Sequence, residues 1–436
     1  MVFHLMGVIN QKRIFDMTSL RKTFSPLLKL LPALLLPLFS TFLTPAAGSG
    51  YLIPEASLRA MGKTSANYVG NDSADAAYYN PAFMDRLSDE GDWELGTLYI
   101  KLEGVSFRGT VSGAPASATS LSESKIVPFF HYVAPKRNEK TRFGLSLVAP
   151  AGLSKRWNTP FQMASAEEFS LEVIELKPSV SFRVSDRFSL AIGPRVIKSE
   201  GVVAITHPTG LYKSYLKGDS VDYGYSIHAA WAASEKVDFG LTWRSRVDLT
   251  MSGNARGSLA TALGAYNFDT PATVDVVLPA VLDLGFAFRH GRNRWELVFE
   301  RAMWSAYSSL DFNYNDPIVE KALGASRAKE WDDSTAIRFG LTRNVDEKLT
   351  LLAGLTWDGV AVPEKTIGFE LPDSDAYAFS IGALYRYRPD MEAGFAYIYD
   401  RKKSRTVSGT INTNGIDGTF DGYNIHLLAL SLRHHF

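Results

Sequence analysis

The sequence predicts an all-β fold, a transmembrane antiparallel β-barrel of about fourteen strands. Three observations predict it. Apolar and polar side chains alternate with the period of a β-strand along most of the chain after residue 90. Aromatic residues make up 12% of the sequence, and the chain ends in Phe436. Aromatic girdles at both membrane interfaces are typical of transmembrane barrels, so these features together indicate strands that cross a membrane.

The N-terminus has the features of a secretory signal peptide. Arg21 and Lys22 precede an apolar stretch, Pro26 to Leu43, which runs into the small residues of 44–48. We therefore expect a signal peptide at 1–48, and Met17 is an alternative start of translation for it. A membrane anchor is the alternative, but Lys29 and three prolines interrupt the stretch below the ~20 apolar residues that a spanning helix needs.

Composition excludes several classes of function. Lys plus Arg and Asp plus Glu number 46 each, so no nucleic-acid partner is expected. There are no cysteines, which excludes zinc thiolates, disulfides and thiol nucleophiles, and no cofactor is indicated. His434 and His435 are adjacent and would point to opposite faces of a strand, so they do not predict a metal site. His228 and His290 have no accompanying nucleophile motif, and we expect no enzyme.

The alternation is clearest in the last third of the chain. Tyr377 to Tyr387 places aromatic side chains at both ends of one face and aliphatic ones between them. Crossing two interfaces and a hydrocarbon core demands that order. A soluble β-sandwich also alternates, but its apolar face would turn inward and would have little use for aromatic residues at both ends.

The same pattern gives the whole strand set. Candidate strands lie near 93–109, 125–134, 141–149, 172–184, 187–199, 222–233, 236–250, 274–289, 293–301, 335–343, 349–357, 377–387, 392–400 and 423–436. Irregular segments are expected at 110–124, 150–171, 200–221, 251–273, 302–334, 359–375 and 401–422. Because they follow every second strand, they match long extracellular loops opposite short periplasmic turns, in a barrel spanning 91–436.

Residues 49–90 do not fit the strand pattern. They are rich in Ala, Ser, Gly and Asn. Such small side chains and turn formers suit packing inside a lumen, and they equally suit a periplasmic tail. Composition alone does not choose between the two positions.

Several motifs in this segment and beyond carry a family resemblance. Gly50 to Ser57, Asp75-Ala76-Ala77 and Asn80-Pro81-Ala82 resemble the N-terminal hatch of FadL-type outer-membrane transporters of long-chain fatty acids and aromatic hydrocarbons. Lys177 to Arg187 resembles the family's Pro-Ser-containing hairpin, and Trp331 to Tyr399 keeps the family's order of motifs. The resemblance covers nearly the whole mature chain.

The resemblance implies a barrel whose lumen is plugged by a hatch, here 49–90. It also implies an interior ligand pocket lined by Tyr51, Leu52 and Ile53, and a lateral exit made by a kinked strand. Asn80, Pro81 and Ala82 would hold the hatch or its contact with the wall. Tyr51 stands where the family often has Phe, which suggests a more polar or differently shaped ligand. The loops around Trp157 and Trp304 could supply an external apolar groove, or could simply pack as loops or in the aromatic girdle.

The sequence therefore predicts a bacterial outer-membrane protein that takes up hydrophobic small molecules. Its expected partners are the ligand, outer-membrane lipid and lipopolysaccharide, and the barrel-assembly machinery, which would recognise Phe436. It is expected to act as a monomer. A general porin and a structural or adhesive barrel remain alternatives.

Overall fold

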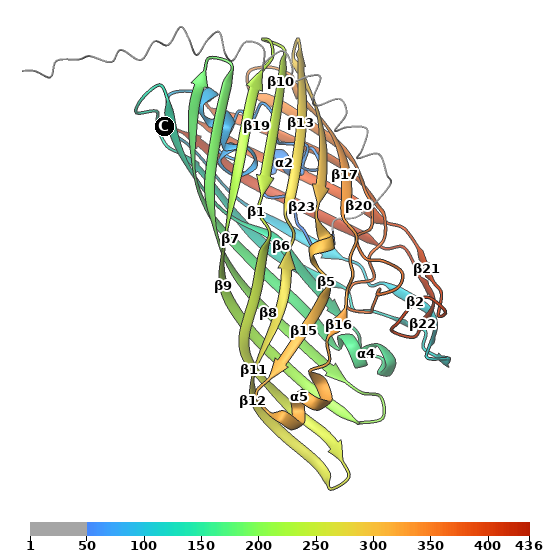
Figure 1. Cartoon of the computed structure of the whole chain (residues 1–436). Coiled ribbons are helices and arrows are strands. Elements are labelled where there is room, and N and C mark those ends of the chain that lie inside the picture. Colours follow the sequence, from blue (N-terminus) through green and yellow to red (C-terminus); the bar gives the residue numbers. More distant parts are fainter. Residues whose placement is uncertain (1–49) are drawn as a thin grey trace, which may run out of the picture. The chain divides into compact units, whose positions relative to one another are not determined.

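The computed structural model describes residues 50–436, and the predicted signal peptide lies outside the described residues. Within this part, fourteen antiparallel strands close into a barrel (Figure 1). In order around the wall they are β1 (Asp92–Leu102), β5 (Glu123–Val133), β6 (Thr141–Arg156), β7 (Glu168–Ser185), β8 (Phe188–Thr206), β9 (Tyr212–Ala232), β10 (Val237–Arg244) continued by β11 (Val247–Thr261), β12 (Gly264–Leu278) continued by β13 (Val281–His290), β14 (Asn293–Ala302) continued by β15 (Ser309–Tyr314), β17 (Ser334–Asn344), β18 (Leu349–Asp358), β19 (Ala376–Arg388), β20 (Met391–Lys402) and β23 (Asn424–His435).

The first and last strands seal the wall. β1 pairs with β23 from Asp92↔His435 to Leu102↔Ile425. At the end of this ladder the Gly91 N–H donates to the Phe436 carbonyl at 2.8 Å, and the Phe436 N–H donates back at 3.0 Å. Closure leaves no sheet edge along this seam, as a wall surrounded by lipid requires.

Short elements connect the strands or fill the space inside them. These are α2 (Leu58–Met61), α3 (Ala76–Tyr79), η1 (Pro81–Arg86), α4 (Pro160–Ala166), η2 (Trp304–Ala306), α5 (Pro317–Leu323) and β16 (Arg327–Ala328). A second, five-stranded sheet comprises β2 (Ser106–Val111), β3 (Ala114–Pro115), β4 (Ala118–Thr119), β21 (Arg405–Val407) and β22 (Ile416–Phe420). Among residues 50–436, no helix has the length and apolar character to cross a membrane.

The outer face of the wall is apolar, as the alternation predicts. On β19, Phe379 and Ile381 are 52% and 62% exposed, whereas Ser380 between them is buried. The strand pairs meet in short turns at one end of the barrel, which by the convention of bacterial barrels faces the periplasm. All fourteen predicted strands are present, and the fold prediction is confirmed.

Two predicted loops are wrong. Most of 200–221 and 251–273 is strand, since β8–β9 and β11–β12 continue as paired ribbons that form the lower end in Figure 1. In these ribbons the faces exchange character: Lys198 and Glu200 of β8 point outward, while Val203 lies in the interior. Outside the membrane these ribbons have water on their outer face and packed side chains on their inner face. Their polar residues therefore point outward and their apolar residues inward, the reverse of the pattern in lipid, and a search for apolar outward faces misses the ribbons.

The predicted first strand is also too long. β1 ends at Leu102, and 106–111 turns away as β2 into the second sheet. At the turn a Cβ on Gly104 would stand 2.3 Å from the Ser120 carbonyl oxygen, so the sharp bend needs a glycine. Because apolar and polar residues continue to alternate through this turn, the sequence pattern does not reveal where β1 ends.

The segment before β1 lies inside the barrel and plugs it. Its elements α2, α3 and η1 are buried almost throughout, and they contact the inner faces of β5 to β9, β19, β20 and β23. The wall strands present polar side chains to the lumen because their apolar faces are turned to lipid. The plug must therefore satisfy those polar groups as well as fill the space.

Ion pairs and hydrogen bonds attach the plug to the wall. Lys63 pairs with Glu296 of β14 at 2.9 Å, and Glu296 also accepts the Val69 N–H at 2.8 Å. Arg59 pairs with Glu392 of β20 at 3.0 Å. On other strands the attachments are Arg183 to Asp85, Lys177 to the Tyr78 carbonyl, His131 to the Ala56 carbonyl and Arg142 to the Met84 and Leu87 carbonyls. The plug is thus fixed around most of the barrel circumference.

Removing one partner of the Lys63–Glu296 pair should loosen the plug. Both side chains are fully buried, so Lys63→Met leaves a buried carboxylate without its cation, at a cost of about 3–5 kcal/mol. We expect a lower heat-unfolding midpoint and faster proteolysis of residues 50–90, and a smaller loss in the double variant Lys63→Met/Glu296→Gln. Lys217→Met, at an exposed pair, is the matched control and should leave the unfolding midpoint nearly unchanged, because solvent screens that pair. Equal effects of the single and double variants would contradict this account.

Candidate functional site

The barrel wall has an opening between β5 and β6. Backbone pairing of these strands covers only four residue pairs, from Phe130↔Leu147 to Val133↔Gly144. On the other side of the opening, the next backbone hydrogen bond between the two segments runs from the Leu121 N–H, before β5, to the Arg156 carbonyl at the end of β6, at 2.9 Å. Between these points β5 pairs with β1 and β6 pairs with β7, but they do not pair with each other.

A bulge in β6 separates the strands. The register between β6 and β7 shifts between Val148 and Ala151, where Ala149 and Pro150 oppose the single residue Ile174. Proline has no N–H to donate to a neighbouring strand, and an extra residue bends the strand that carries it. The bulge therefore turns β6 away from β5 while keeping it paired with β7.

The plug supplies the hydrogen bonds that β6 loses at this edge. The Ile53 N–H donates to the Pro150 carbonyl at 2.8 Å, and the Gly152 N–H donates to the Tyr51 carbonyl at 2.9 Å. Leu52 forms an antiparallel bridge with Ala151 between them. Residues 51–53 thus act as a short strand on the exposed edge of β6, so this part of the β6 backbone has hydrogen-bond partners at the opening.

A cavity of about 410 Å³ lies beside this short strand. That volume is within the roughly 300–1,000 Å³ usual for ligand cavities. Its lining is mainly apolar and includes Leu52, Ile53, Ile100, Val127, Phe129 and Val173. It also includes Ile126, which is 75% exposed on the outer face of β5. The cavity therefore runs from the lumen through the opening to the outside of the wall.

One end of the cavity carries charged groups. Arg338 pairs with Glu300 at 2.9 Å, and Lys402 pairs with Asp373 at 3.2 Å. Lys155 of β6 differs from these cations. It is 4% exposed, its ammonium lies 5.4 Å from the ring centroid of Tyr423, and no described carboxylate is within ion-pair distance. A buried ammonium without a counter-ion is costly, so this end of the cavity is suited to an anionic group.

Glu55 of the plug also lines the cavity. Its carboxylate accepts a hydrogen bond from the Ser65 hydroxyl at 3.1 Å. Burial within the barrel raises the pKa of Glu55 to about 7, and Arg338 opposes that rise without cancelling it. The charge of the cavity therefore changes near neutral pH.

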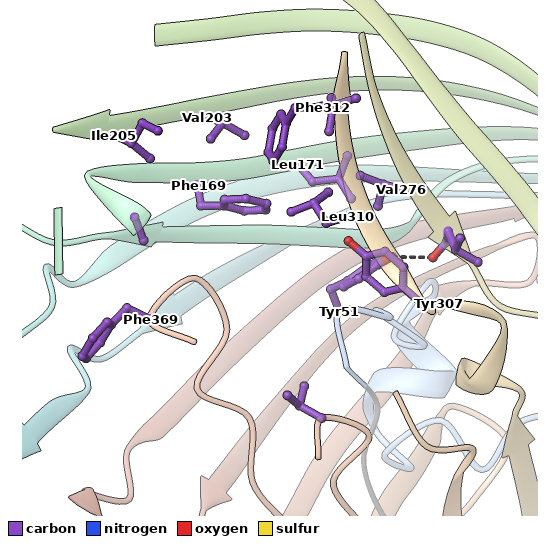
Figure 2. Close-up of a cluster of buried hydrophobic side chains, with 14 of the residues drawn as sticks. Tyr51, Phe169, Leu171, Val203, Ile205, Val276, Tyr307, Leu310, Phe312 and Phe369 are labelled. Atoms are coloured by element: carbon purple, nitrogen blue, oxygen red, sulfur yellow. Dashed lines mark hydrogen bonds between the residues drawn. The ribbon is translucent and has the colours of Figure 1, made fainter. Parts of the chain in front are cut away.

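Tyr51 separates this cavity from a much smaller one, of about 30 Å³, which Leu153, Leu171 and Leu371 also border. Figure 2 shows its ring beside Tyr307, at the end of a row of apolar side chains from β7, β8, β12 and β15. The Tyr51 ring contacts Trp304 edge-on at 4.7 Å between centroids and lies 5.7 Å from Trp331. Its hydroxyl donates to the Val277 carbonyl, the dashed bond in Figure 2. The hydroxyl thus fixes the ring to the wall and does not add a polar group to the larger cavity.

The motif Asn80-Pro81-Ala82 lies elsewhere, where the plug meets β9. The Asn80 side chain donates to the Ala229 carbonyl of β9 at 3.1 Å and to the Tyr68 carbonyl at 3.3 Å. Its oxygen accepts the Ala82 N–H at 3.2 Å, so Asn80 caps η1, which Pro81 begins. Tyr51, Leu52 and Ile53, by contrast, all line the larger cavity.

Of the two alternatives for the loops around Trp157 and Trp304, the structure favours packing over an external groove. Trp157 is buried, its indole N–H donates to the Phe369 carbonyl at 2.9 Å, and it packs on the Phe369 ring. Trp304 is buried against Tyr51. These aromatic side chains fill the interior because the lumen above the plug is apolar.

Sequence reasoning missed two features of the site. Pro150 begins the predicted irregular segment 150–171, but it lies within β6 and could have indicated the bulge, since proline inside a sheet is confined to edges and irregularities. Lys155 gave no such signal, because its isolation depends on which carboxylates other strands bring near it.

Comparison with known proteins agrees with this architecture. The family model of outer membrane protein transport proteins (OMPP1/FadL/TodX) matches residues 39–436. The chain belongs to this family. It is a family of outer-membrane transport proteins and not of enzymes, and the predicted localisation in the outer membrane is confirmed.

Curated relatives are distant but match over nearly their full length. The long-chain fatty acid transport protein of Salmonella typhi is 24% identical, over 82% of this chain and 88% of its own. Outer membrane protein P1 of Haemophilus influenzae is 22% identical, over 84% and 90%.

Solved structures share the fold. A FadL homologue from Pseudomonas aeruginosa superimposes with a TM-score of 0.74 at 20% identity, covering 89% of this chain and all of that one. The toluene transporter TodX of Pseudomonas putida gives 0.68 at 16% identity, covering 90% and 99%.

The pKa of Glu55 predicts a pH-dependent stability. Its folded-state pKa of about 7 lies above the ordinary value of 4.5, so the folded protein holds the proton more tightly. The resulting stabilisation is complete below pH 4.5 and is lost as the pH rises to 7. Heat-unfolding midpoints measured from pH 4.5 to 8 should fall across this window, and Glu55→Gln should flatten the fall. Glu200→Gln, at an exposed site, is the control. An unchanged slope in Glu55→Gln would contradict the assignment.

Proposed function

We propose that this protein takes up hydrophobic small molecules across the outer membrane and releases them sideways through the opening between β5 and β6. The observation that carries the proposal is the apolar cavity that continues through that opening to the outer face of the wall. Transfer from water to apolar surroundings favours a ligand by about 0.8 kcal/mol per CH₂. A plugged barrel with an apolar exit therefore suits such a ligand better than a water-filled pore.

We assign ligand binding to Tyr51, Leu52 and Ile53, which line the cavity. Asn80, Pro81 and Ala82 hold the plug against β9. The limits of the hatch, 49–90, and of the barrel, 91–436, are part of the same proposal. Gly91, where the chain enters the wall beside Phe436, supports the boundary between them.

The favoured ligand is a long-chain carboxylate. Lys155 supports this choice, since it gives the cavity a buried ammonium without a counter-ion. The relative from Salmonella typhi is named for long-chain fatty acids, whereas TodX is named for toluene. A purely hydrocarbon ligand would leave Lys155 buried and unpaired.

A general porin and an adhesive barrel are the alternatives. A porin needs an open lumen, and the plug occupies this one. Planar-bilayer recordings should therefore show no large, steady ion current from the purified protein. An adhesive barrel has no need of Lys155 or Tyr51, so its function should survive their replacement.

Other partners follow from the surface. The apolar belt of the wall suits outer-membrane lipid and lipopolysaccharide. Phe436 follows β23 and has a half-exposed ring, which suits recognition by the barrel-assembly machinery. A monomer is the state we propose.

Replacing Lys155 tests the ligand class. In Lys155→Met, uptake of hexadecanoate by cells should fall at least tenfold, because the carboxylate loses its counter-ion, while uptake of hexadecan-1-ol should change less than twofold. Lys198→Met, at an exposed pair on β8, is the control. Equal losses for acid and alcohol would contradict the choice of a carboxylate. A wild-type protein that carries neither compound would contradict the function itself.

Tyr51 should matter through its ring more than through its hydroxyl. Tyr51→Phe keeps the aromatic contacts and loses one buried hydrogen bond, a cost of about 1 kcal/mol, so uptake should stay within twofold. Tyr51→Ala removes the partition between the two cavities, and uptake should fall at least fivefold. Equal uptake by the two variants, with the barrel intact by its heat-unfolding midpoint, would remove Tyr51 from the site.

A further inference from the structure

A second lysine crosses the opening between β5 and β6. Glu123, Phe129 and His131 of β5 are buried and face the lumen, whereas Ile126 faces outward. By this alternation, Lys125 occupies a position of β5 whose side chain starts toward the lumen. Its ammonium nevertheless lies 2.6 Å from the carboxylate of Glu172, which points outward from β7. The Lys125 side chain therefore begins on the inner face of the wall and ends on the outer one.

The strand between the two partners leaves room for this crossing. On β6, Gly152 pairs directly with Glu172 and has no side chain to obstruct the path. A Cβ at Gly152 would stand 3.2 Å from the Ile53 side chain, so Ile53 fills the adjoining part of the opening. Lys125, Gly152, Glu172 and Ile53 all line the same cavity.

The pair is weak enough to open. The side chains of Lys125 and Glu172 are 34% and 63% exposed, and exposed ion pairs are screened by solvent. No backbone hydrogen bond between β5 and β6 closes the wall at this level. The end of the opening is held separately, by the Leu121–Arg156 hydrogen bond and by Arg156 beside Glu123 at 3.6 Å.

We propose that Lys125 and Glu172 form a latch across the lateral opening, and that a departing carboxylate displaces Glu172 from Lys125 as it leaves. This inference rests on the proposed uptake of a hydrophobic carboxylate. The ligand exchanges the ammonium of Lys155 inside the cavity for that of Lys125 in the opening, then passes into the membrane. Glu172 returns to Lys125 and closes the latch behind it.

Cross-linking tests the latch. The chain contains no cysteine, so in Lys125→Cys/Glu172→Cys a cleavable bifunctional thiol-reactive reagent, such as a bis-maleimide, reacts only at the latch. Cross-linking should reduce uptake of both hexadecanoate and hexadecan-1-ol at least tenfold, and cleavage of the reagent should restore it. Glu200→Cys/Lys217→Cys is the matched control, since that exposed pair joins β8 and β9, which are already hydrogen-bonded to each other. Cross-linking there should change uptake less than twofold.

Two further measurements test the exchange of carboxylates. Lys125→Met should slow hexadecanoate uptake at least fivefold and leave hexadecan-1-ol at or above the wild-type rate. Glu172→Gln, which removes the competing carboxylate and keeps the ammonium of Lys125, should not slow the uptake of either compound.

The outcomes separate the two proposals. If the wild type carries both compounds and the cross-linked latch carries them equally well, the latch is overturned and the proposed function stands. If Lys125→Met slows acid and alcohol equally, the exchange of carboxylates is overturned. A wild-type protein that carries neither compound overturns the proposed function and the latch with it.

Discussion

Backbone hydrogen bonding at membrane depth is the constraint on which this structure depends. A strand edge left open in lipid costs several kcal/mol for each unpaired group, so a barrel wall cannot simply be parted to make an exit. Here the bulge at Ala149-Pro150 parts β5 from β6, and residues 51–53 of the plug take up the edge of β6. The opening and the plug therefore require each other: without the plug the opening would leave an unpaired edge in contact with lipid.

The same coupling explains how firmly the plug is attached. A segment that completes the wall at one point must not drift, and buried ion pairs such as Lys63–Glu296 and Arg59–Glu392 give it fixed positions on distant strands. Buried pairs of this kind add little net stability compared with apolar packing, but they penalise every other placement heavily. The contribution of these pairs is therefore to hold the plug in one position within the barrel. The polar lumen, which exists because the wall turns its apolar face to lipid, supplies the partners.

The membrane-crossing strands could be predicted because lipid imposes one rule, apolar side chains outward, on every one of them. Above the membrane the rule reverses, as on β12, where Asp269 points outward and Phe268 inward, so those ribbons resembled loops. The contacts of Tyr51 with Trp304 and the isolation of Lys155 join residues far apart in sequence. No local pattern encodes them, although the family resemblance brought Tyr51 to attention. Pro150 could have indicated the bulge, but the alternation ended the predicted strand at residue 149, so the bulge was missed.

A buried ammonium that binds carboxylates, as we propose for Lys155, must also release them. Inside the cavity an ion pair with Lys155 is little screened, because few water molecules reach it and the effective dielectric constant is low. Near the outer face, the same carboxylate beside a partly exposed ammonium is screened by solvent and held weakly. The head group therefore passes from tight to loose binding as it moves outward, while the alkyl chain gains the hydrocarbon of the membrane. The loss of the tight ion pair opposes outward movement, and the transfer of the alkyl chain into the hydrocarbon of the membrane favours it. Net release therefore requires that the gain from the chain exceed the loss of the ion pair.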